Sequence, residues 1–173
     1  TTAGTSLIVD INPGPRGSSP QWITDSNGRI YFSARRDDVG RELWRLEESE
    51  QSATRIISTD EGRSKLKALH GNADEFRFEL AGQFGKRQAD RITGFDQTEG
   101  DQLALGRDVF DGLTDIDLVT VTSKTQLTDQ RDSNNTGLIY FEPKGKLYFN
   151  QNGDESGYGE DGGLFAILKG GPE

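Results

Sequence analysis

The sequence of 173 residues contains no cysteine, no methionine, a single histidine and no long apolar run. Without cysteine the chain has no disulfide, no thiolate nucleophile and no cysteine-ligated zinc site. One histidine excludes metal sites that need several imidazoles. A transmembrane helix needs about 18 or more consecutive apolar residues, so the sequence predicts no membrane span.

Basic charge is also scarce, because 20 Lys and Arg stand against 29 Asp and Glu, a formal net charge of −9. Most of the excess negative charge lies in residues 61–173. Binding of nucleic acid requires cations that neutralise phosphates, so we expect no nucleic-acid partner. Glycine is plentiful, at 22 residues, and this abundance indicates many turns.

The first third of the chain alternates short apolar segments with turn signals, and we expect four antiparallel strands there. The Asn27-Gly28 pair favours a hairpin turn, because both residue types tolerate positive φ. Four strands within about 50 residues are typical of one propeller blade. The expected strands are residues 7–9, 21–24, 29–34 and 42–46.

Four motifs in fixed order carry a family resemblance: GTSLIVDINPG at residues 4–14, GSSP at 17–20, GRIYF at 28–32 and GRELW at 40–44. They resemble one unit of the ELWxxDGT repeats of large bacterial surface or secreted proteins, which are taken to form propeller-like β-structure. Residues 48–50 depart from the repeat, which has Asp-Gly-Thr there. The resemblance implies a last, degenerate copy. We expect upstream repeats and, since Thr1 is not Met, a longer parent protein.

The sequence pattern of residues 61–173 also predicts mainly strands. Residues 107–112 are expected to form a short helical turn. Residues 126–136 are polar and have no apolar pattern, which predicts a mobile loop. The expected strands are residues 75–80, 91–95, 101–105, 116–122, 137–141, 146–149 and 164–169.

This second stretch is similar to the C-terminal domain that closes RTX-type, serralysin-like (hemolysin-type) β-rolls in proteins exported by type I secretion. The motifs are LHGNADEFRF at residues 69–78, DRITGF at 90–95, GDQLAL at 100–105, GKLYF at 145–149 and GLFAIL at 163–168. The resemblance implies a calcium-linked β-fold at the C-terminal end of a secreted protein.

Calcium is therefore the first candidate ligand, because glycine-rich turns of a β-roll offer backbone carbonyls and Asp carboxylates to this hard cation. Asp74 stands at the Asp position of one such turn, and Asp90 and Asp101 are candidates to complete a site at the cap. The alternative is that these Asp side chains only cap turns through hydrogen bonds to the backbone.

A second candidate calcium site is the acidic loop, residues 150–161. Oxygen donors at Asn150, Asn152 and Asp154, with Asp161 eleven residues after the first, are similar to an EF-hand loop. The glycine falls at a different position, and Asp161 stands where Glu is expected. A glycine-rich hairpin loop without an ion is the alternative.

Catalytic signals are weak, since no nucleophile motif surrounds any serine, and we expect no enzyme. The aromatic residues of the first segment allow two interpretations, a flat platform for sugars or packing between sheets. They are Trp22, Tyr31, Phe32 and Trp44.

The sequence thus predicts an all-β protein with a blade-like four-stranded unit at residues 1–60 and a roll-capping or sandwich-like β domain at residues 61–173. We expect a non-catalytic, C-terminal segment of an exported bacterial surface protein, extracellular or at the cell surface. Its role is secretion, calcium-linked folding and adhesion or surface display. The alternative is a carbohydrate-binding or glycan-processing module, and a third possibility is a structural cap without a ligand.

Overall fold

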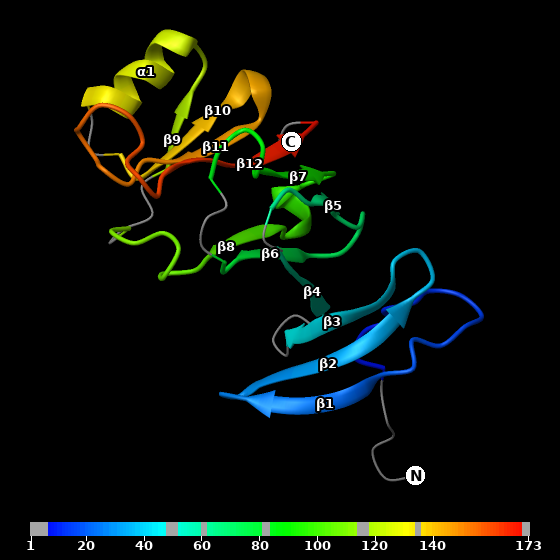
Figure 1. Ribbon diagram of the computed structural model, residues 1–173. Helices are drawn as coiled ribbons and strands as arrows, with labels where there is room; N and C mark the ends of the chain where they lie inside the picture. Colours follow the sequence, from blue (N-terminus) through cyan, green and yellow to red (C-terminus); the bar gives the residue numbers. More distant parts are fainter. Residues whose placement is uncertain are drawn as a thin grey trace.

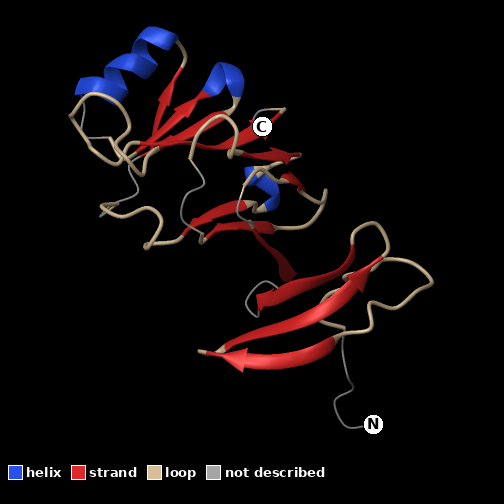
Figure 2. Ribbon diagram, viewed as in Figure 1, coloured by secondary structure: helices blue, strands red, loops and turns tan. Residues whose placement is uncertain are grey.

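The computed structural model describes residues 7–47, 52–59, 62–80, 84–113, 118–133 and 136–170. Within these ranges the chain forms twelve strands, one α-helix and two short 3-10 helices, at Gln97–Glu99 and Glu142–Lys144 (Figure 2). The expected all-β protein is therefore confirmed in a coarser form, since the structure is mostly β. None of the helices found in this part of the chain is long and apolar enough to cross a membrane.

Sheet A has six strands in the order β1-β2-β3-β4-β6-β8. The first four form an antiparallel meander, and β6 and β8 extend it through parallel pairs. The β1–β2 turn is the expected hairpin, with positive φ at Asn27 (54°) and Gly28 (74°). The strands are β1 (Gln21–Ser26), β2 (Arg29–Arg36), β3 (Gly40–Glu47), β4 (Ser52–Ser58), β6 (Asp74–Phe78) and β8 (Gln102–Leu105).

Sheet B also has six strands, in the order β5-β7-β12-β11-β10-β9. Strands β5, β7 and β12 are parallel neighbours, β12-β11-β10 is antiparallel, and β9 pairs in parallel with β10. The strands are β5 (Lys65–Lys67), β7 (Asp90–Thr93), β9 (Leu118–Val121), β10 (Leu138–Phe141), β11 (Lys146–Phe149) and β12 (Gly163–Lys169).

The middle of the chain alternates between the two sheets. Strands β4, β6 and β8 lie in sheet A, and β5 and β7, which come between them in sequence, lie in sheet B. Each of β6, β7 and β8 pairs in parallel with the strand that lies two places before it in sequence. Strands β4 to β8 therefore wind as a coil, and we call them the coil. In Figure 1 the β1–β3 part of the meander projects away from sheet B.

Apolar side chains between the two sheets form the main core. It contains Phe76 and Phe78 from sheet A and Phe149 and Phe165 from sheet B, all almost fully buried. Phe78 and Phe165 pack edge to face with ring centroids 5.3 Å apart. Alternation of side chains along each strand explains this core, because one face of each sheet is apolar.

Two features of the predicted architecture differ in the structure, the pairing of the strands and the first strand of the meander. Both sheets are mixed, whereas only antiparallel pairing was expected, because parallel pairing depends on distant segments and leaves no local signal. Residues 7–9 are not a strand, and the fourth strand of the meander is β4. The predicted domain boundary at residues 60/61 falls between two strands of one sheet, since β4 pairs with β6.

The expected mobile loop at residues 126–136 is wrong for most of its length, because helix α1 spans Lys124–Ser133. Its apolar pattern is weak, with Leu127 packing on the outer face of sheet B. The helix begins with a capping box: Gln126 N–H donates to Ser123 Oγ (3.2 Å), and Ser123 N–H donates to Gln126 Oε1 (3.2 Å). This Ser-x-x-Gln signal was present in the sequence.

The four aromatic residues of the meander have different environments. Trp44 is fully buried and its indole N–H donates to the Ala34 carbonyl (3.3 Å), and Phe32 is also buried. Tyr31 is half-buried, whereas Trp22 is 79% exposed. Packing is therefore the correct interpretation for Trp44 and Phe32.

The expected strand starting at Ile116 lies partly outside the described residues. The repeat residues 4–6 and 48–50 lie wholly outside them.

Candidate functional site

Two of the expected calcium ligands, Asp74 and Asp101, lie together at one end of the coil. Each closes the turn that precedes its own strand. Asp74 Oδ2 accepts from Leu69 N–H (2.6 Å), and Asp101 Oδ2 accepts from Asp96 N–H (2.9 Å). The two turns are equivalent, since the N–H group belongs in both cases to the residue five places before the carboxylate.

The same carboxylates also connect successive turns of the coil. Asp101 Oδ1 accepts from the backbone N–H of Asp74 (2.9 Å), 27 residues earlier. Both side chains are buried, at 0% exposure for Asp74 and 6% for Asp101. Both residues therefore make the turn-capping hydrogen bonds that were the predicted alternative to calcium binding.

Arg55, on the neighbouring strand β4, balances the charge of Asp74. Its Nε donates to Asp74 Oδ1 (2.7 Å), and its Nη2 donates to Asp74 Oδ2 (3.1 Å) and to the Lys67 carbonyl (2.6 Å). The guanidinium thus contacts a carboxylate and a backbone carbonyl, which are the ligand types of calcium. We call Arg55, Asp74 and Asp101 the turn cluster. Its positive charge is the Arg55 guanidinium.

Asp101 differs from Asp74, because its recorded hydrogen bonds come from backbone N–H groups and not from a cation. Burial raises the pKa of Asp101 to about 6, although the N–H groups of Asp96 and Asp74 favour the charged form and the nearby Asp74 and Glu99 carboxylates disfavour it. The Asp101 carboxyl group therefore changes charge in mildly acidic solution.

The outer face of sheet A has a second buried ionic network. Glu75 accepts from Arg45 Nη1 (2.6 Å) and Arg77 Nε (2.6 Å), and Arg45 Nε contacts Glu47 (2.5 Å). Burial acts to raise the pKa of Glu75, but the two guanidinium groups outweigh it and hold the pKa below its usual value. This network connects β3 to β6 across β4, which lies between them in the sheet.

The single histidine lies at the mouth of the same end of the coil. His70 Nδ1 is 2.6 Å from Glu99 Oε1, and the side chain of His70 is 98% exposed. Both residues line a polar hollow of about 690 Å³, and Arg36 and Arg45 line it as well. Its lining residues carry charges of both signs. The hydroxyl groups among these lining residues belong to Ser52 and Thr54.

Asp90 lies apart from the turn cluster. It begins β7, at the opposite end of the coil, and its Oδ1 accepts from Ser64 N–H (2.6 Å). Its side chain is almost fully buried. Asp90 therefore joins the start of β7 to the residue before β5, as Asp101 joins β8 to β6.

The acidic loop, residues 150–161, connects β11 to β12. Asn150 Nδ2 donates to the Gly153 carbonyl (2.6 Å), and Asn152 Nδ2 donates to the Ser156 carbonyl (3.2 Å). Both Oδ1 atoms are buried and neither has a hydrogen-bond partner among the described residues. The loop is tightly folded, because a Cβ at Gly162 would overlap the Tyr158 carbonyl oxygen.

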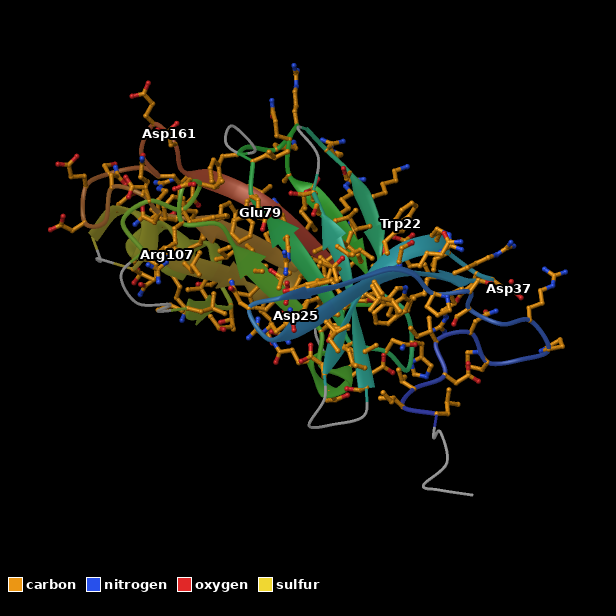
Figure 3. All side chains as sticks on the ribbon, turned by 90° about the horizontal axis from the view of Figure 1, so that it is seen from below. Trp22, Asp25, Asp37, Glu79, Arg107 and Asp161 are labelled. Atoms are coloured by element: carbon orange, nitrogen blue, oxygen red, sulfur yellow. The ribbon has the colours of Figure 1, made fainter. Side chains whose placement is uncertain are left out.

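The two expected carboxylate ligands of this loop, Asp154 and Asp161, are exposed. Gln151 Oε1 accepts from Asp161 N–H (2.9 Å), which brings the two ends of the loop together. Asp161 lies at the outer surface, at the far end of the molecule from Asp37 (Figure 3). The loop therefore combines buried amide oxygens with carboxylates that face solvent.

Helix α1 is fastened to the acidic loop. Asp132 Oδ1 accepts from Gly157 N–H (2.9 Å) and Ser156 Oγ (3.3 Å). The Arg131 guanidinium lies 5.9 Å from the centroid of the Tyr158 ring, which stacks on Tyr148 (centroids 5.1 Å apart, 7° between planes). Hydrogen bonds from Arg131 and from Gly157 N–H hold the pKa of Asp132 far below its usual value.

The structure thus divides the seven expected calcium ligands into the turn cluster, Asp90 and the acidic loop. In the described ranges no three His, Cys, Asp or Glu side chains gather where they could hold a metal ion. The orphaned oxygens of Asn150 and Asn152 are the observation that fits a hard cation, since amide oxygen is a calcium ligand. Sequence reasoning missed Arg55, whose only signal is a cation within the apolar strand β4.

Comparison of the chain with protein-family models, with curated proteins and with solved structures finds no match.

Removal of one partner of the buried Arg55–Asp74 ion pair should strongly destabilise the fold. Arg55→Met removes the guanidinium and leaves the Asp74 carboxylate buried and uncompensated. We expect the free energy of unfolding to fall by about 3 kcal/mol or more, measured by urea denaturation. The double variant Arg55→Met/Asp74→Asn removes the unpaired charge as well, and we expect it to regain part of this loss.

Arg16→Met is the matched control, because Arg16 pairs with Asp37 at 3.7 Å with both side chains exposed. Its expected effect is within about 0.5 kcal/mol. An equal loss of stability in Arg55→Met and Arg16→Met would contradict a structural role for the buried pair.

Stability should also depend on pH through Asp101. Its pKa is about 6 in the folded chain, against an ordinary value of 3.8, so folding takes up a proton between these values. Its contribution to stability is full below about pH 4 and is lost as pH rises through 6, a loss of roughly 1–3 kcal/mol. Glu75, whose pKa is lowered, contributes with the opposite sign as pH falls below about 4.5.

Urea denaturation of wild type and Asp101→Asn between pH 4 and pH 7 separates the two effects. We expect the wild type to lose stability over this range relative to the variant, because the amide that replaces the Asp101 carboxyl does not titrate. Parallel pH profiles for the two proteins would show that Asp101 does not titrate near 6.

Proposed function

We propose that the chain is a calcium-stabilised, non-catalytic segment of a large exported bacterial surface protein, and that it serves secretion, folding outside the cell and surface display or adhesion. In this proposal an ELWxxDGT-like unit at residues 1–60 precedes an RTX-type closing region at residues 61–173. Upstream repeats of the same chain are its expected neighbours.

The observation that carries the proposal is the pair of buried, unpartnered oxygens in the acidic loop. A buried polar atom without a partner is costly, so native proteins seldom leave two in one loop. A calcium ion is bound by such amide oxygens together with carboxylates, and Asp154 and Asp161 are aspartates of the same loop. We therefore assign calcium to Asn150, Asn152, Asp154 and Asp161.

The coil supports the second element of the proposal. Strands that alternate between two sheets, with parallel neighbours in each, are the arrangement expected of a β-roll. In this coil Arg55 already balances Asp74, and Asp101 and Asp90 bond to backbone N–H groups. In the turn cluster the chain itself supplies the partners of the carboxylates, whereas the acidic loop has two buried amide oxygens for which calcium is the proposed partner.

Charge explains why calcium would control folding. A chain with a net charge of −9 repels itself when it is compacted, and the repulsion acts where carboxylates converge. A cation bound only by the folded loop adds its binding free energy to folding. Folding would then wait until the protein meets a calcium-rich medium outside the cell.

Thermal unfolding with calcium and with a chelator tests this proposal. At a calcium concentration of about 100 times Kd we expect the melting temperature to rise by roughly 5 °C or more. Asp154→Asn/Asp161→Asn removes two ligands at exposed positions, so it should melt like wild type in chelator and lose the calcium response.

The matched control is Asp25→Asn/Asp37→Asn, which makes the same change in net charge at two exposed positions of the meander. We expect this variant to keep the full response to calcium. Identical melting temperatures in calcium and in chelator would rule out the calcium assignment. A response lost equally in both double variants would show nonspecific screening of charge.

One observation favours a second candidate function, the binding of carbohydrate. Trp22 is 79% exposed on the edge strand β1, next to the exposed Ile23, and it adopts a positive φ of 55°. An exposed indole is the kind of flat surface on which sugar rings stack. Trp44 is fully buried and offers no such surface.

A glycan array probed with wild type and Trp22→Ala tests this candidate. If the function is carbohydrate binding, the array signal should fall by about ten-fold or more in Trp22→Ala and stay unchanged in Leu43→Ala, an exposed apolar control on β3. A flat array with wild type would leave the calcium-stabilised surface segment as the proposal.

A further inference from the structure

The outer face of sheet B, which points away from the main core, has two different halves. On the half formed by β9 and β10, Leu127 of α1 packs against a cluster that includes Val121 and Ile139. Figure 1 shows α1 at that side and β5 and β7 at the opposite edge of the sheet. The second half, formed by β5, β7, β12 and the start of β11, carries positive charge.

The strand register places three of these cations on β5 and β7. Leu66 of β5 and Ile92 of β7 pack in the main core. Side chains alternate along a strand, so Lys65, Lys67 and Arg91 project from the outer face. Lys65 pairs directly with Arg91 across the two strands. The three cations therefore lie on one surface.

The same surface continues across β12 and β11. Arg91 pairs with Ile167 of β12, and Ile167 pairs with Lys146 of β11. Lys169 lies two residues beyond Ile167 and so on the same face. We call these five cations the basic face: Lys65, Lys67, Arg91, Lys146 and Lys169.

In the described ranges none of the five forms an ion pair. The three lysines of β5 and β12 are exposed, and Arg91 is half-buried with an Nε atom that has no hydrogen-bond partner among these residues. The only acidic residue in the sequences of β5, β7, β11 and β12 is Asp90, which is almost fully buried. The basic face is therefore unbalanced positive charge on a chain whose net charge is −9.

Other carboxylates lie only at one end of the basic face. Lys67 and Lys169 border a hollow of about 480 Å³. Its lining includes the carboxylates of Asp96 and Glu99, and neither pairs with a lysine. These two carboxylates leave the β5–β7–β11 row of the basic face without a counter-charge.

The acidic loop has the complementary charge. It contains no Lys or Arg and four exposed acidic residues, Asp154, Glu155, Glu160 and Asp161. The loop joins the end of β11 to the start of β12, whereas Lys146 begins β11 and Lys169 ends β12. Opposite charges therefore lie at opposite ends of the β11–β12 hairpin.

The acidic loop lies too far from the basic face of its own molecule to contact it. Strand β12 has seven residues, which span roughly 20 Å. In Figure 1 the loop lies at the left end of sheet B, whereas β5, β7 and the end of β12 lie to the right. Figure 3 shows Asp161 at the outer surface, pointing away from the molecule. The loop is therefore placed to contact a second copy of the chain.

We propose that copies of this chain associate head to tail, with the acidic loop of one copy on the basic face of the next. The Arg91 guanidinium can hold a carboxylate with two hydrogen bonds, and the lysines act as point charges around it. The contact joins two different surfaces, so it can repeat from copy to copy. Glu155 and Glu160 are not among the assigned calcium ligands, so this association does not depend on calcium binding.

Sedimentation equilibrium in the presence of chelator measures the association. Exposed ion pairs are individually weak, so we use protein at roughly 0.05–1 mM in about 0.1 M salt. We expect the average mass of the wild type to rise by about half or more over this range. It should fall to the monomer mass in about 1 M salt, because the Debye length is then about 3 Å.

Two charge reversals test whether the contact is specific. Lys65→Glu/Lys169→Glu alters the basic face, and Glu155→Lys/Glu160→Lys alters the acidic loop without replacing an assigned calcium ligand. Each variant alone should stay monomeric. An equimolar mixture should form pairs, because each variant supplies the surface that the other lacks. Both variants keep a negative net charge, so attraction between opposite net charges would not explain the pairs.

Arg29→Glu/Arg107→Glu is the matched control, since it makes the same change in charge at exposed positions outside sheet B. It should associate like wild type, and circular dichroism verifies the fold of each variant. If Lys65→Glu/Lys169→Glu does not fold, Lys65→Gln/Lys67→Gln replaces it. The proposal is overturned if wild type is monomeric at every concentration, or if the mixture of the two reversals stays monomeric. A monomeric wild type that binds vesicles of anionic lipid through these lysines would assign the basic face to a membrane surface instead.

Discussion

The fold depends on a charged contact between two sheet strands that are distant in sequence. The guanidinium of Arg55 bonds to the carboxylate of Asp74, and the pair is buried where the antiparallel meander meets the parallel coil. A buried ion pair adds little net stability, because desolvation of both groups offsets their attraction. Its effect is on register, since Arg55 and Asp74 face one another across β4 and β6. A slip by one residue would leave a buried carboxylate alone.

From this pair the polar contacts continue through the coil. Asp74 holds the turn before β6, and Asp101 holds both the turn before β8 and the backbone of Asp74. The turns are thus stacked through carboxylates, and the first of them is the one that Arg55 neutralises. Burial raises the pKa of Asp101, whereas Asp74 bonds to the Arg55 guanidinium. The positive charge of Arg55 therefore lies at the first turn, and the carboxyl group of the second turn changes its charge with pH.

The sequence predicted the strands well where the signal was local. The Asn27-Gly28 turn and the alternation in β2 and β3 depend on adjacent residues, and the structure contains both. Parallel pairing of β4 with β6 was not predicted, because it depends on segments separated by loops and a strand of the other sheet. Helix α1 was missed since its only strong signal is the Ser123–Gln126 capping box, while its apolar periodicity is weak.

Prediction of the candidate site was limited in a similar way. The sequence named Asp74, Asp90 and Asp101 as candidate ligands of one site, and the structure brings Asp74 and Asp101 together but places Asp90 at the other end of the coil. The contact of Asp74 with Arg55 depends on pairing between strands. In the acidic loop the residue types were visible, whereas the burial of two amide oxygens emerges only from the folded loop. Oxygen-rich composition therefore suggests where a cation could bind, and burial decides where one is needed.

The acidic loop is also the point at which a bound ion would act on the rest of sheet B. Asp132 of α1 accepts hydrogen bonds from Ser156 and Gly157 of the loop, and Tyr158 stacks on Tyr148 of β11. An ion that tightens the loop would fix these donors and this ring together. The helix that covers the outer face of sheet B would then be held in place by the loop. If the acidic loop binds calcium as proposed, ion binding and packing of α1 would be parts of one equilibrium, because the same backbone serves both.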